Sequence, residues 1–507
     1  MLELTVFCSG ALVMILEMVG GRILAPHVGT SAIVWTSLIG VVLAFLALGA
    51  WAGGRYADKN LSSRGLGLAL ALAGLGCAIT AFCHNAIGSG ITSSVGNLYV
   101  AAVAAAIGIF ALPAFFFGMI TPYVIRLRLA GLDTAGATVG RLYALSTAGS
   151  ILGTFLGGFV LISWFSSTAI LWSVAICMIL LSLLNNLKKP ALRLAVVFLF
   201  AFLAWQDKSY AYWQGQNGGQ KLVETPYNSI RIMEGKDYRR NGEAVRLIAT
   251  DPGYTQSGML INDPQKLYFD YTRFYALGPA HSPEAKNILM LGGGGYSVPK
   301  WLLSGKSGLA NPREMNLVVV ELDPAMTSIA KSDFALKDDS RLKIRHEDAR
   351  AFLNSQQDKY DLVFVDVFNS HYSVPFHVGT RQAAKEMARA LAPGGMLLMN
   401  VISAVEGEDG RLFRSIYHAL GESFEEVDVY CVSLPERPGE VQNLMLAAYH
   451  QKPAREKKRL AKVGIDPAMD EIEKMEATLY KKAIPDDVPA LDDDFSPVDR
   501  YTLMLRK

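Results

Sequence analysis

The sequence predicts an all-α membrane bundle of six or seven helices, followed by a small antiparallel β domain and a doubly wound α/β domain. Apolar segments long enough to cross a bilayer follow one another up to about residue 205 of 507. Short runs of alternating polarity come next, and strand-like runs then alternate with helical stretches. We expect domains at residues 1–206, 207–262 and 263–450, with a helical extension at 451–507.

Composition and charge separate the same two parts. Mean hydropathy is +0.25 and only 19% of the residues are charged, which is unusual for a soluble enzyme. Ten basic and four acidic residues precede residue 205, whereas 38 basic and 42 acidic residues follow it. The chain has no basic stripe that would indicate binding to nucleic acid. Its five cysteines form no CxxC pair and no spaced framework, so the sequence indicates neither disulfides nor a metal site.

Seven segments are candidates for membrane-spanning helices, because each approaches the length of about 20 apolar residues that a span requires. They are residues 2–21, 32–54, 65–86, 97–125, 137–162, 168–187 and 191–205, of which the last is short. Basic residues gather after the second, fourth and sixth segments. By the positive-inside bias, the N-terminus and these loops are cytoplasmic. If residues 191–205 also crossed, the α/β part would emerge on the outside.

Two features of the membrane part are not expected of helices that only face lipid. Glu17 lies within the first segment, where a charge is costly and usually faces a partner or a cavity. A protonated or snorkelling side chain near the helix end is the alternative. Gly149, Gly153 and Gly157 form a stripe of small residues in the fifth segment. Such a stripe lets helices pack closely, either within the chain or in a homodimer.

The second part contains five apolar runs of strand length, at residues 288–291, 317–320, 342–344, 362–365 and 396–400. Helical stretches separate them, and this alternation is typical of a doubly wound parallel sheet. Two earlier runs, at residues 229–233 and 245–248, predict the small antiparallel sheet. Ligands of a parallel sheet bind at the carboxyl ends of its strands, so the polar residues there are the site candidates.

The predicted strand ends carry glycines and acids. Glycines 292–294 follow the first strand and let the backbone approach a ligand closely. Glu321 ends the second strand, where an acid can bind both ribose hydroxyls. Asp348 follows the third strand, where it can accept from an adenine amino group, and Asp366 follows the fourth. One such acid is explained by an ordinary helix cap. Three acids at successive strand ends beside a glycine loop predict a nucleoside site.

These residues resemble the spermidine synthase (aminopropyltransferase) family over about residues 221–450. Residues 227–230, residues 255–258 and Tyr268 add to the likeness. The whole chain is similar to bacterial membrane-fused spermidine synthase-like proteins, whose Asp-Asp-aromatic-x-Pro-Val ending matches residues 493–498 here. The resemblance implies a Rossmann-like fold of the SAM-binding type. It also implies transfer of an aminopropyl group from decarboxylated S-adenosylmethionine to an amine or polyamine, which releases methylthioadenosine and needs no metal.

The resemblance also implies roles for single residues. Asp366 is the expected catalytic residue, a general base that takes the proton of the attacking amine. The expected nucleoside-binding residues are Gly292, Gly293, Gly294, Glu321, Asp348, Ala349 and Gln256. The expected amine-binding residues, which supply aromatic faces and one amide to a cation, are Tyr227, Tyr268, Asn369 and Tyr372.

Three departures from the family pattern leave the donor and the acceptor open. The family has Asp directly after the three glycines, where this chain has Gly295. A second Asp, three residues after the catalytic one, is Asn369 here, and the His-Glu after the upstream Tyr is replaced by Phe269-Asp270. A SAM-dependent methyltransferase or a 3-amino-3-carboxypropyl transferase is therefore the alternative. A polyamine transport or sensing module, which Glu17 would serve, is the alternative from another class.

The expected location follows from the adenosyl donor, which is found in the cytosol. We expect a multi-pass protein of the bacterial inner membrane whose α/β part faces the cytoplasm. Residues 191–205 would then lie along the inner surface or re-enter it. The expected partners are a small-molecule amine or polyamine and the lipid bilayer, with no nucleic acid, and a homodimer is expected if the glycine stripe packs between chains.

Overall fold

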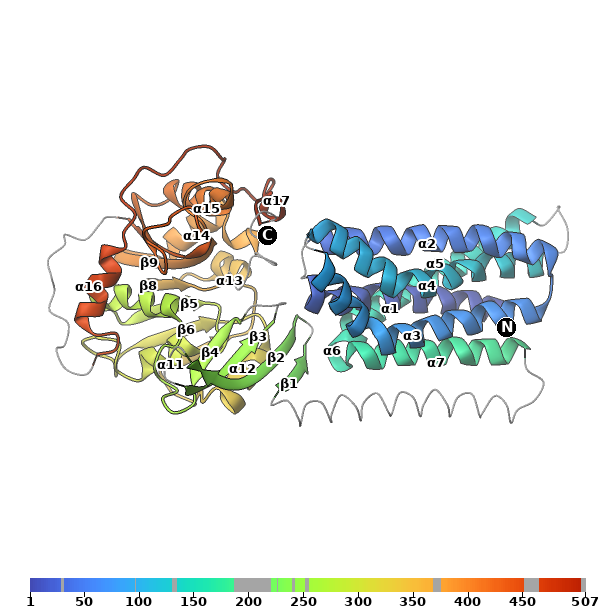
Figure 1. Cartoon of the computed structure of the whole chain (residues 1–507), viewed down its shortest axis with the longest axis horizontal. Coiled ribbons are helices and arrows are strands. Elements are labelled where there is room, and N and C mark those ends of the chain that lie inside the picture. Colours follow the sequence, from blue (N-terminus) through green and yellow to red (C-terminus); the bar gives the residue numbers. More distant parts are fainter. Residues whose placement is uncertain are drawn as a thin grey trace. The chain divides into compact units, whose positions relative to one another are not determined.

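The computed structural model describes residues 1–28, 32–95, 97–129, 135–186, 220–225, 227–238, 242–250, 255–367, 375–450 and 465–502. The chain divides into two compact units, Met1–Ile230 and Arg231–Lys507, and each is described by itself (Figure 1). The predicted seventh membrane segment and two predicted site residues, Asn369 and Tyr372, lie outside the described residues.

The first unit is built from long apolar helices. They are α1 (Leu2–Val28), α2 (Ala32–Lys59), α3 (Ser63–Ser94), α4 (Leu98–Arg128), α5 (Ala135–Phe155) and α7 (Ser167–Asn186). A π-helical turn, Leu156–Leu161, and the short α6 (Ile162–Trp164) extend α5. Within the described ranges, six helices have the length and composition of membrane spans, as the first six predicted segments require.

The outer surface of these helices is apolar as well. Phe82 is 73% exposed, Phe159 74% and Trp164 79%. Large apolar side chains exposed in this way are unfavourable in water, whereas in hydrocarbon they carry no such cost. The first unit is therefore suited to a lipid surrounding.

The glycine stripe of α5 packs against α1 of the same chain. A Cβ atom on Gly149 would collide with the backbone of Phe7, and one on Gly153 with the backbone of Ala11. Small residues are required there because the two helix backbones approach each other closely. The stripe therefore packs α5 against α1 of the same chain. The homodimer stays a prediction, and the stripe no longer argues for it.

The small antiparallel sheet follows the predicted runs. Its strands have the order β1 (Gln220–Glu224), β2 (Ser229–Asp237), β3 (Glu243–Ala249) and β4 (Ser257–Leu260). β2 and β3 pair with Arg231 opposite Ala249, and β3 and β4 pair with Val245 opposite Leu260. Gly242, which precedes β3, has a φ of +76°, a backbone conformation that glycine adopts without strain.

A seven-stranded sheet forms the centre of the second unit, in the order β10-β11-β9-β8-β5-β6-β7. The five predicted strands are confirmed as the parallel part: β5 (Asn287–Leu291), β6 (Asn316–Val320), β7 (Leu342–Arg345), β8 (Tyr360–Val365) and β9 (Leu391–Ser403). The sequence did not predict the two antiparallel strands at the edge, β10 (Glu426–Cys431) and β11 (Gln442–Tyr449).

Successive residues of each parallel strand bury opposite faces of this sheet. In β5, Ile288 and Met290 enter one core, and Leu289 and Leu291 enter the other. Helices cover both faces (Figure 1). One core includes α13 (Ala349–Ser355), α14 (Arg381–Ala390), α15 (Arg411–Gly421) and α17 (Val498–Thr502). The other core includes α10 (Leu277–His281), α11 (Ser297–Leu303), α12 (Pro324–Asp333) and α16 (Met469–Ala477).

The predicted C-terminal extension is part of these cores. Ile472 and Met475 of α16 are buried in one core, and Leu491 and Tyr501 are buried in the other. The described tail is therefore not a purely solvated face, and it is helical only in α16 and α17.

The strand order reverses its direction across the sheet between β5 and β8. From β5 the chain proceeds to β6 and β7 on one side, and then returns to β8 and β9 on the other. The loops after β5 and β8 therefore diverge, which creates the crevice where such sheets bind ligands. At this point the Asp366 amide donates to the Leu291 carbonyl at 2.8 Å.

Candidate active site

The loop after β5 brings backbone amides to the carboxyl edge of the sheet. Gly292 has a φ of +91°, and a Cβ atom there would collide with the backbone of Asp366. Glycine thus permits the ends of β5 and β8 to meet. The amides of Gly293 and Gly294 both donate to Glu321 Oε2, at 2.9 and 3.0 Å.

Glu321 lies at the end of β6 and is only 9% exposed. Its second oxygen, Oε1, accepts from the Asp323 amide at 3.0 Å. Desolvation raises the pKa of Glu321, and the amides of Asp323, Gly293 and Gly294 oppose this in part, so that the pKa lies above its ordinary value. The carboxylate thus shapes the glycine loop, and its predicted contact with ribose stays a prediction.

Asp366 follows β8, and its carboxyl group is largely enclosed by protein. Asn400 Nδ2 donates to Oδ1 at 3.1 Å, and the Tyr271 hydroxyl donates to Oδ2 at 3.4 Å. Desolvation raises the pKa of Asp366 to about 6, although these two hydrogen bonds favour the carboxylate and lower it in part. A carboxylate with this pKa is mostly ionised at neutral pH and can still take up a proton, as a general base must.

A chain of two amides fixes the Asp366 carboxylate from the neighbouring strands. Asn443 Nδ2, in β11, donates to Asn400 Oδ1, in β9, at 2.9 Å. The Asn400 amide group is thereby oriented with its nitrogen toward Asp366. Sequence reasoning missed both asparagines, although Asn400 is a polar residue at the end of an otherwise apolar predicted strand.

A small cavity lies in front of Asp366. Four predicted site residues line it: Gln256, Gly293, Gly294 and Asp366. Their neighbours in the wall include Phe269, Tyr271 and Ser257, of which Tyr271 was not predicted. Gln256 Oε1 is buried and has no hydrogen-bond partner among the described residues. This oxygen is therefore an acceptor that a ligand would satisfy.

Gly295 occupies the position at which the resembled family has Asp, and no room for a side chain exists there. Its amide donates to Ser257 Oγ at 2.9 Å. A Cβ atom on Gly295 would lie 2.9 Å from Ser257 Cβ and 3.2 Å from Phe334 Cδ1. The space beside Gly295 is therefore filled by Ser257 and Phe334 and does not admit the aspartate side chain of the resembled family.

Asp348 caps the N-terminus of α13. Its Oδ1 accepts from the amides of Arg350 and Ala351, at 2.8 and 3.0 Å, and its Oδ2 lies 3.0 Å from His377 Nε2. Desolvation raises the pKa of Asp348, but the Ala351 amide, His377 and the Arg350 amide outweigh it, and the pKa lies below its ordinary value. Ala349 is the first residue of the helix. The geometry is that of a helix cap with one oxygen left toward the edge of the sheet.

The predicted amine-binding residues are only partly located. The Tyr268 hydroxyl donates to Asp237 Oδ2 of β2 at 2.9 Å, and its ring contacts Gly258. Tyr227 lies in the turn before β2 and is 48% exposed. Neither residue lines the cavity in front of Asp366, and their roles stay predictions, as do those of Asn369 and Tyr372.

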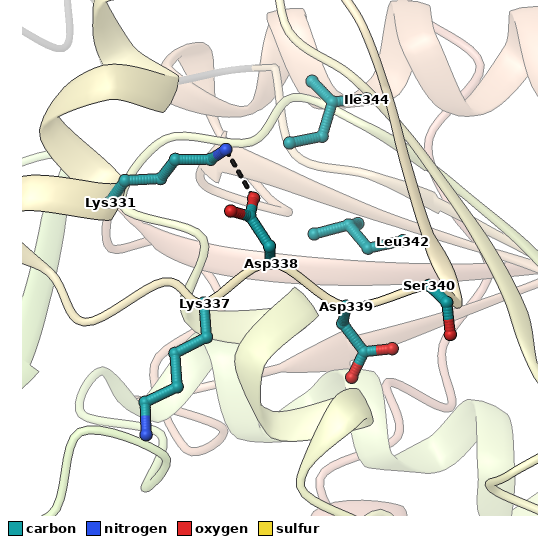
Figure 2. A pocket seen from close by; sticks show the side chains of 7 residues that line it. All are labelled: Lys331, Lys337, Asp338, Asp339, Ser340, Leu342 and Ile344. Atoms are coloured by element: carbon teal, nitrogen blue, oxygen red, sulfur yellow. Dashed lines mark hydrogen bonds and ion pairs between the residues drawn. The ribbon is translucent and has the colours of Figure 1, made fainter.

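A second hollow lies beside the start of β7 (Figure 2). Lys331 Nζ pairs there with Asp338 Oδ1 at 2.6 Å. Leu342, the first residue of β7, lies in its wall. The hollow thus lies at the amino end of a parallel strand, away from the edge where such sheets bind ligands. We assign it no function.

Within the described ranges, no group of three or more His, Cys, Asp or Glu side chains is placed to hold an ion.

Comparison with known proteins identifies the α/β part. Residues 272–457 match the spermine/spermidine synthase domain. The chain is 26% identical to the polyamine aminopropyltransferase of Vibrio vulnificus over 321 residues, which cover 60% of this chain and 97% of that protein. It is 29% identical to the polyamine aminopropyltransferase of Lachnospira eligens over 160 residues, 31% of this chain and 54% of that protein.

A solved structure is similar as well. A probable spermidine synthase from Corynebacterium glutamicum aligns with a TM-score of 0.40 and 23% identity, over 46% of this chain and 81% of that one. The family match and the curated relatives agree on one assignment. The α/β part of the chain is spermidine synthase-like, its curated relatives are polyamine aminopropyltransferases, and helices of membrane-span length precede it in the sequence.

Proposed function

We propose that the protein transfers an aminopropyl group from decarboxylated S-adenosylmethionine to an amine or polyamine, with methylthioadenosine as the second product. One observation carries the proposal. The Asp366 carboxylate lies at the reversal point of the sheet, has a pKa of about 6, and is held by Asn400 and Tyr271 at the wall of a cavity that the glycine loop also lines. The relatives named above are polyamine aminopropyltransferases, which supports the proposal.

The chemistry asks little of the protein beyond placement and one proton transfer. The amine nitrogen attacks the methylene carbon next to the sulfonium, a C–N bond forms, and the C–S bond breaks with its electron pair going to sulfur. The nitrogen must lose a proton, because an ammonium has no lone pair to attack with. Asp366 accepts this proton as general base. Holding donor and acceptor in line supplies much of the remaining rate enhancement.

The donor's nucleoside would be held by the neighbouring strand ends. Glu321 would accept from the ribose hydroxyls, and Asp348 Oδ2 would accept from the adenine amino group. Gly293 and Gly294 allow close approach of the backbone. Gln256 Oε1, which has no partner in the described part of the chain, offers one further acceptor toward the cavity.

A second candidate function is favoured by Gly295. A carboxylate at this position would repel the carboxylate of ordinary S-adenosylmethionine, and the structure has neither that carboxylate nor room for one. A methyltransferase or a 3-amino-3-carboxypropyl transferase would accept the ordinary donor. In the resembled family, the Asp at this position is expected to hold the aminopropyl ammonium of the decarboxylated donor, and this chain lacks that contact. Gly295 therefore does not decide between the two donors, and the donor must be tested directly.

The proposed location is the inner membrane of a bacterium, with the enzyme domain in the cytoplasm. The six span-length helices and their exposed apolar side chains support a membrane position. The positive-inside bias and the cytosolic origin of the donor support the orientation.

The deciding experiment incubates the purified full-length protein with each donor and a panel of amines, and identifies the products by mass spectrometry. We expect an aminopropylated amine and methylthioadenosine from the decarboxylated donor. Methylated or carboxypropylated product from the ordinary donor would replace the proposal by the second candidate. No product from either donor, with amine flux in proteoliposomes, would favour the transport alternative.

The role of Asp366 is tested separately from the identity of the substrates. Asp366→Asn should lower turnover by orders of magnitude while leaving methylthioadenosine affinity nearly unchanged, because the amide cannot accept the proton. Glu321→Ala is the matched variant, since it should weaken methylthioadenosine binding in calorimetry. Near-normal turnover in Asp366→Asn would show that the proton leaves by another route.

A further inference from the structure

The C-terminal segment around Asp493 connects to the nucleoside side of the site. We propose that Asp493 is a positioning residue for Asp348, acting through Arg350 and His377, and that it thereby supports recognition of the adenine amino group. The inference rests on the proposed function, because it requires Asp348 to bind adenine.

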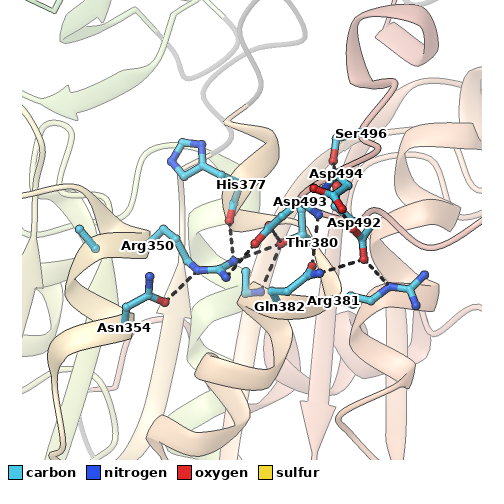
Figure 3. Close-up of polar contacts among 12 residues, drawn as sticks. Arg350, Asn354, His377, Thr380, Arg381, Gln382, Asp492, Asp493, Asp494 and Ser496 are labelled. Carbon is cyan, nitrogen blue, oxygen red and sulfur yellow. Dashed lines mark hydrogen bonds and ion pairs between the residues drawn. The ribbon is translucent and has the colours of Figure 1, made fainter.

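The Asp493 side chain makes two polar contacts with the helical layer beside β7 and β8 (Figure 3). Its Oδ2 lies 3.1 Å from Arg350 Nη2, and its Oδ1 accepts from Thr380 Oγ1 at 2.7 Å. The Arg350 side chain is 16% exposed and the Asp493 side chain 43%, so solvent screens this ion pair only in part. The partners are 143 and 113 residues away in the sequence.

Arg350 uses its remaining donors to hold the turn that carries His377. Nη1 donates to the His377 carbonyl at 3.2 Å and lies 3.2 Å from Thr380 Oγ1, while Nε donates to Asn354 Oδ1 at 3.0 Å. Figure 3 shows the guanidinium between Asp493, Thr380 and the His377 backbone. The planar guanidinium can serve several acceptors at once because its donors are fixed in one fork. Asp493 therefore orients a group that in turn restrains His377.

His377 completes the connection to Asp348. Because the helix amides of Arg350 and Ala351 occupy Asp348 Oδ1, only Oδ2 remains for a ligand. His377 Nε2 lies 3.0 Å from this oxygen, and both side chains are 39% exposed. A carboxylate oxygen has two lone pairs, so Oδ2 can accept from His377 and from an adenine amino group together. His377 thus fixes the direction of the acceptor without consuming it.

The chain offers a matched control next to Asp493. Asp492 lies in the same segment, and its side chain contacts Arg381 Nε at 3.2 Å and Gln382 Nε2 at 2.9 Å and accepts from the Asp494 amide at 2.9 Å. None of these partners is Arg350. Removing the Asp492 carboxylate therefore tests attachment of the segment, whereas removing the Asp493 carboxylate tests the connection to Asp348.

The experiment measures binding of two ligands to the full-length protein by calorimetry. Methylthioadenosine has the amino group, and 5′-methylthioinosine has a carbonyl in its place. We expect Asp493→Ala and His377→Ala to weaken methylthioadenosine binding by about three- to tenfold, the range for one lost hydrogen bond. Binding of the inosine compound should change little, so the preference between the two ligands falls. Asp492→Ala should leave the preference at its wild-type value.

Two further variants separate the possible failures. Asp348→Ala must abolish the preference, and if it does not, the adenine role in the proposed function is wrong. If it does, but Asp493→Ala behaves like Asp492→Ala, the proposed function stands and the positioning role is overturned. Arg350→Lys keeps the charge opposite Asp493 but lacks the second nitrogen for the His377 carbonyl. It should lower the preference, and an unchanged preference would also overturn the positioning role, even if Asp493→Ala did not fold.

Discussion

Replacing Asn400 by Leu should move the pH dependence of the reaction to higher pH. Asn400 Nδ2 donates to Asp366 Oδ1 at 3.1 Å, and this hydrogen bond stabilises the ionised form of the proposed base. Leu has nearly the same shape as Asn but cannot donate. The carboxylate then loses a stabilising contact while its desolvation remains, so the pKa of Asp366 rises further above its present value of about 6.

The size of the effect follows from the strength of such a bond. A hydrogen bond to a charged group contributes about 1.5 to 3 kcal/mol, and about 1.4 kcal/mol corresponds to one pH unit. The acidic limb of the rate profile should therefore move upward by about one to two pH units. The remaining contact from Tyr271, at 3.4 Å, is long and offsets little of this loss.

The assay is kcat/KM as a function of pH, because its limbs report ionisations of the free enzyme and the free substrate. Wild type and variant are measured with the same amine, so any limb due to the amine is common to both. In the variant the rate should approach the wild-type rate at high pH, where Asp366 is ionised in either protein.

Asn443 supplies the control for this substitution. In Asn400→Leu, the Asn443 amide loses the acceptor to which it donates at 2.9 Å. The double variant Asn400→Leu/Asn443→Leu removes this unpaired group and should regain stability, while its acidic limb stays at the shifted position. An acidic limb that does not move in either variant would refute the assignment of Asp366 as the titrating base.

Three other predictions follow from the same structure. Asp366→Asn should stabilise the protein by about 3 kcal/mol at pH 8. In wild type, the folded-state pKa of Asp366 is about 6 against an ordinary 3.8, so the stability of the protonated form is fully present below pH 4 and is lost as the pH rises through 6. The Asn side chain does not ionise and therefore avoids this loss. Thermal unfolding at pH 8 should show this gain and unfolding at pH 4 should not. Gly295→Asp should destabilise the protein by about 1 to 3 kcal/mol through overpacking. Adding Ser257→Gly should restore much of the melting temperature. Equal stability of wild type, the single variant and the double variant would contradict the collision with Ser257. Alkaline phosphatase fused after Lys221 or Lys507 should be inactive in cells, and activity at both positions would place the enzyme domain outside.

Patterns that depend on neighbours in the sequence predicted the architecture well. Apolar segments of span length gave six of the helices, and the alternation of short apolar runs with helical stretches gave the five parallel strands. The strand ends then indicated Glu321 and Asp366, because the carboxyl edge of a parallel sheet is where its ligands bind. The inferences about helices and strands succeed because periodicity is a local property, whereas the roles of Glu321 and Asp366 stay predictions.

The antiparallel edge of the sheet was harder to predict. β10 alternates polar and apolar residues and β11 is a largely apolar run, but neither pattern reveals which strand will be the partner. Their pairing with β9 matters for the site, since it brings Asn443 beside Asn400 and so fixes the amide that faces Asp366.

The sequence by itself determined that a bundle of apolar, span-length helices precedes a small antiparallel sheet and an α/β domain, and it located the acids at three strand ends. Only the tertiary structure decided how those acids are held. Asn400 reaches Asp366 across 34 residues, and Asp493 reaches Arg350 across 143. It also decided that Gly295 has no room for a side chain, because Ser257 and Phe334 fill that space. Contacts between distant segments set the pKa, the orientation and the space of a site, and the identity of a residue's neighbours in sequence carries no information about them.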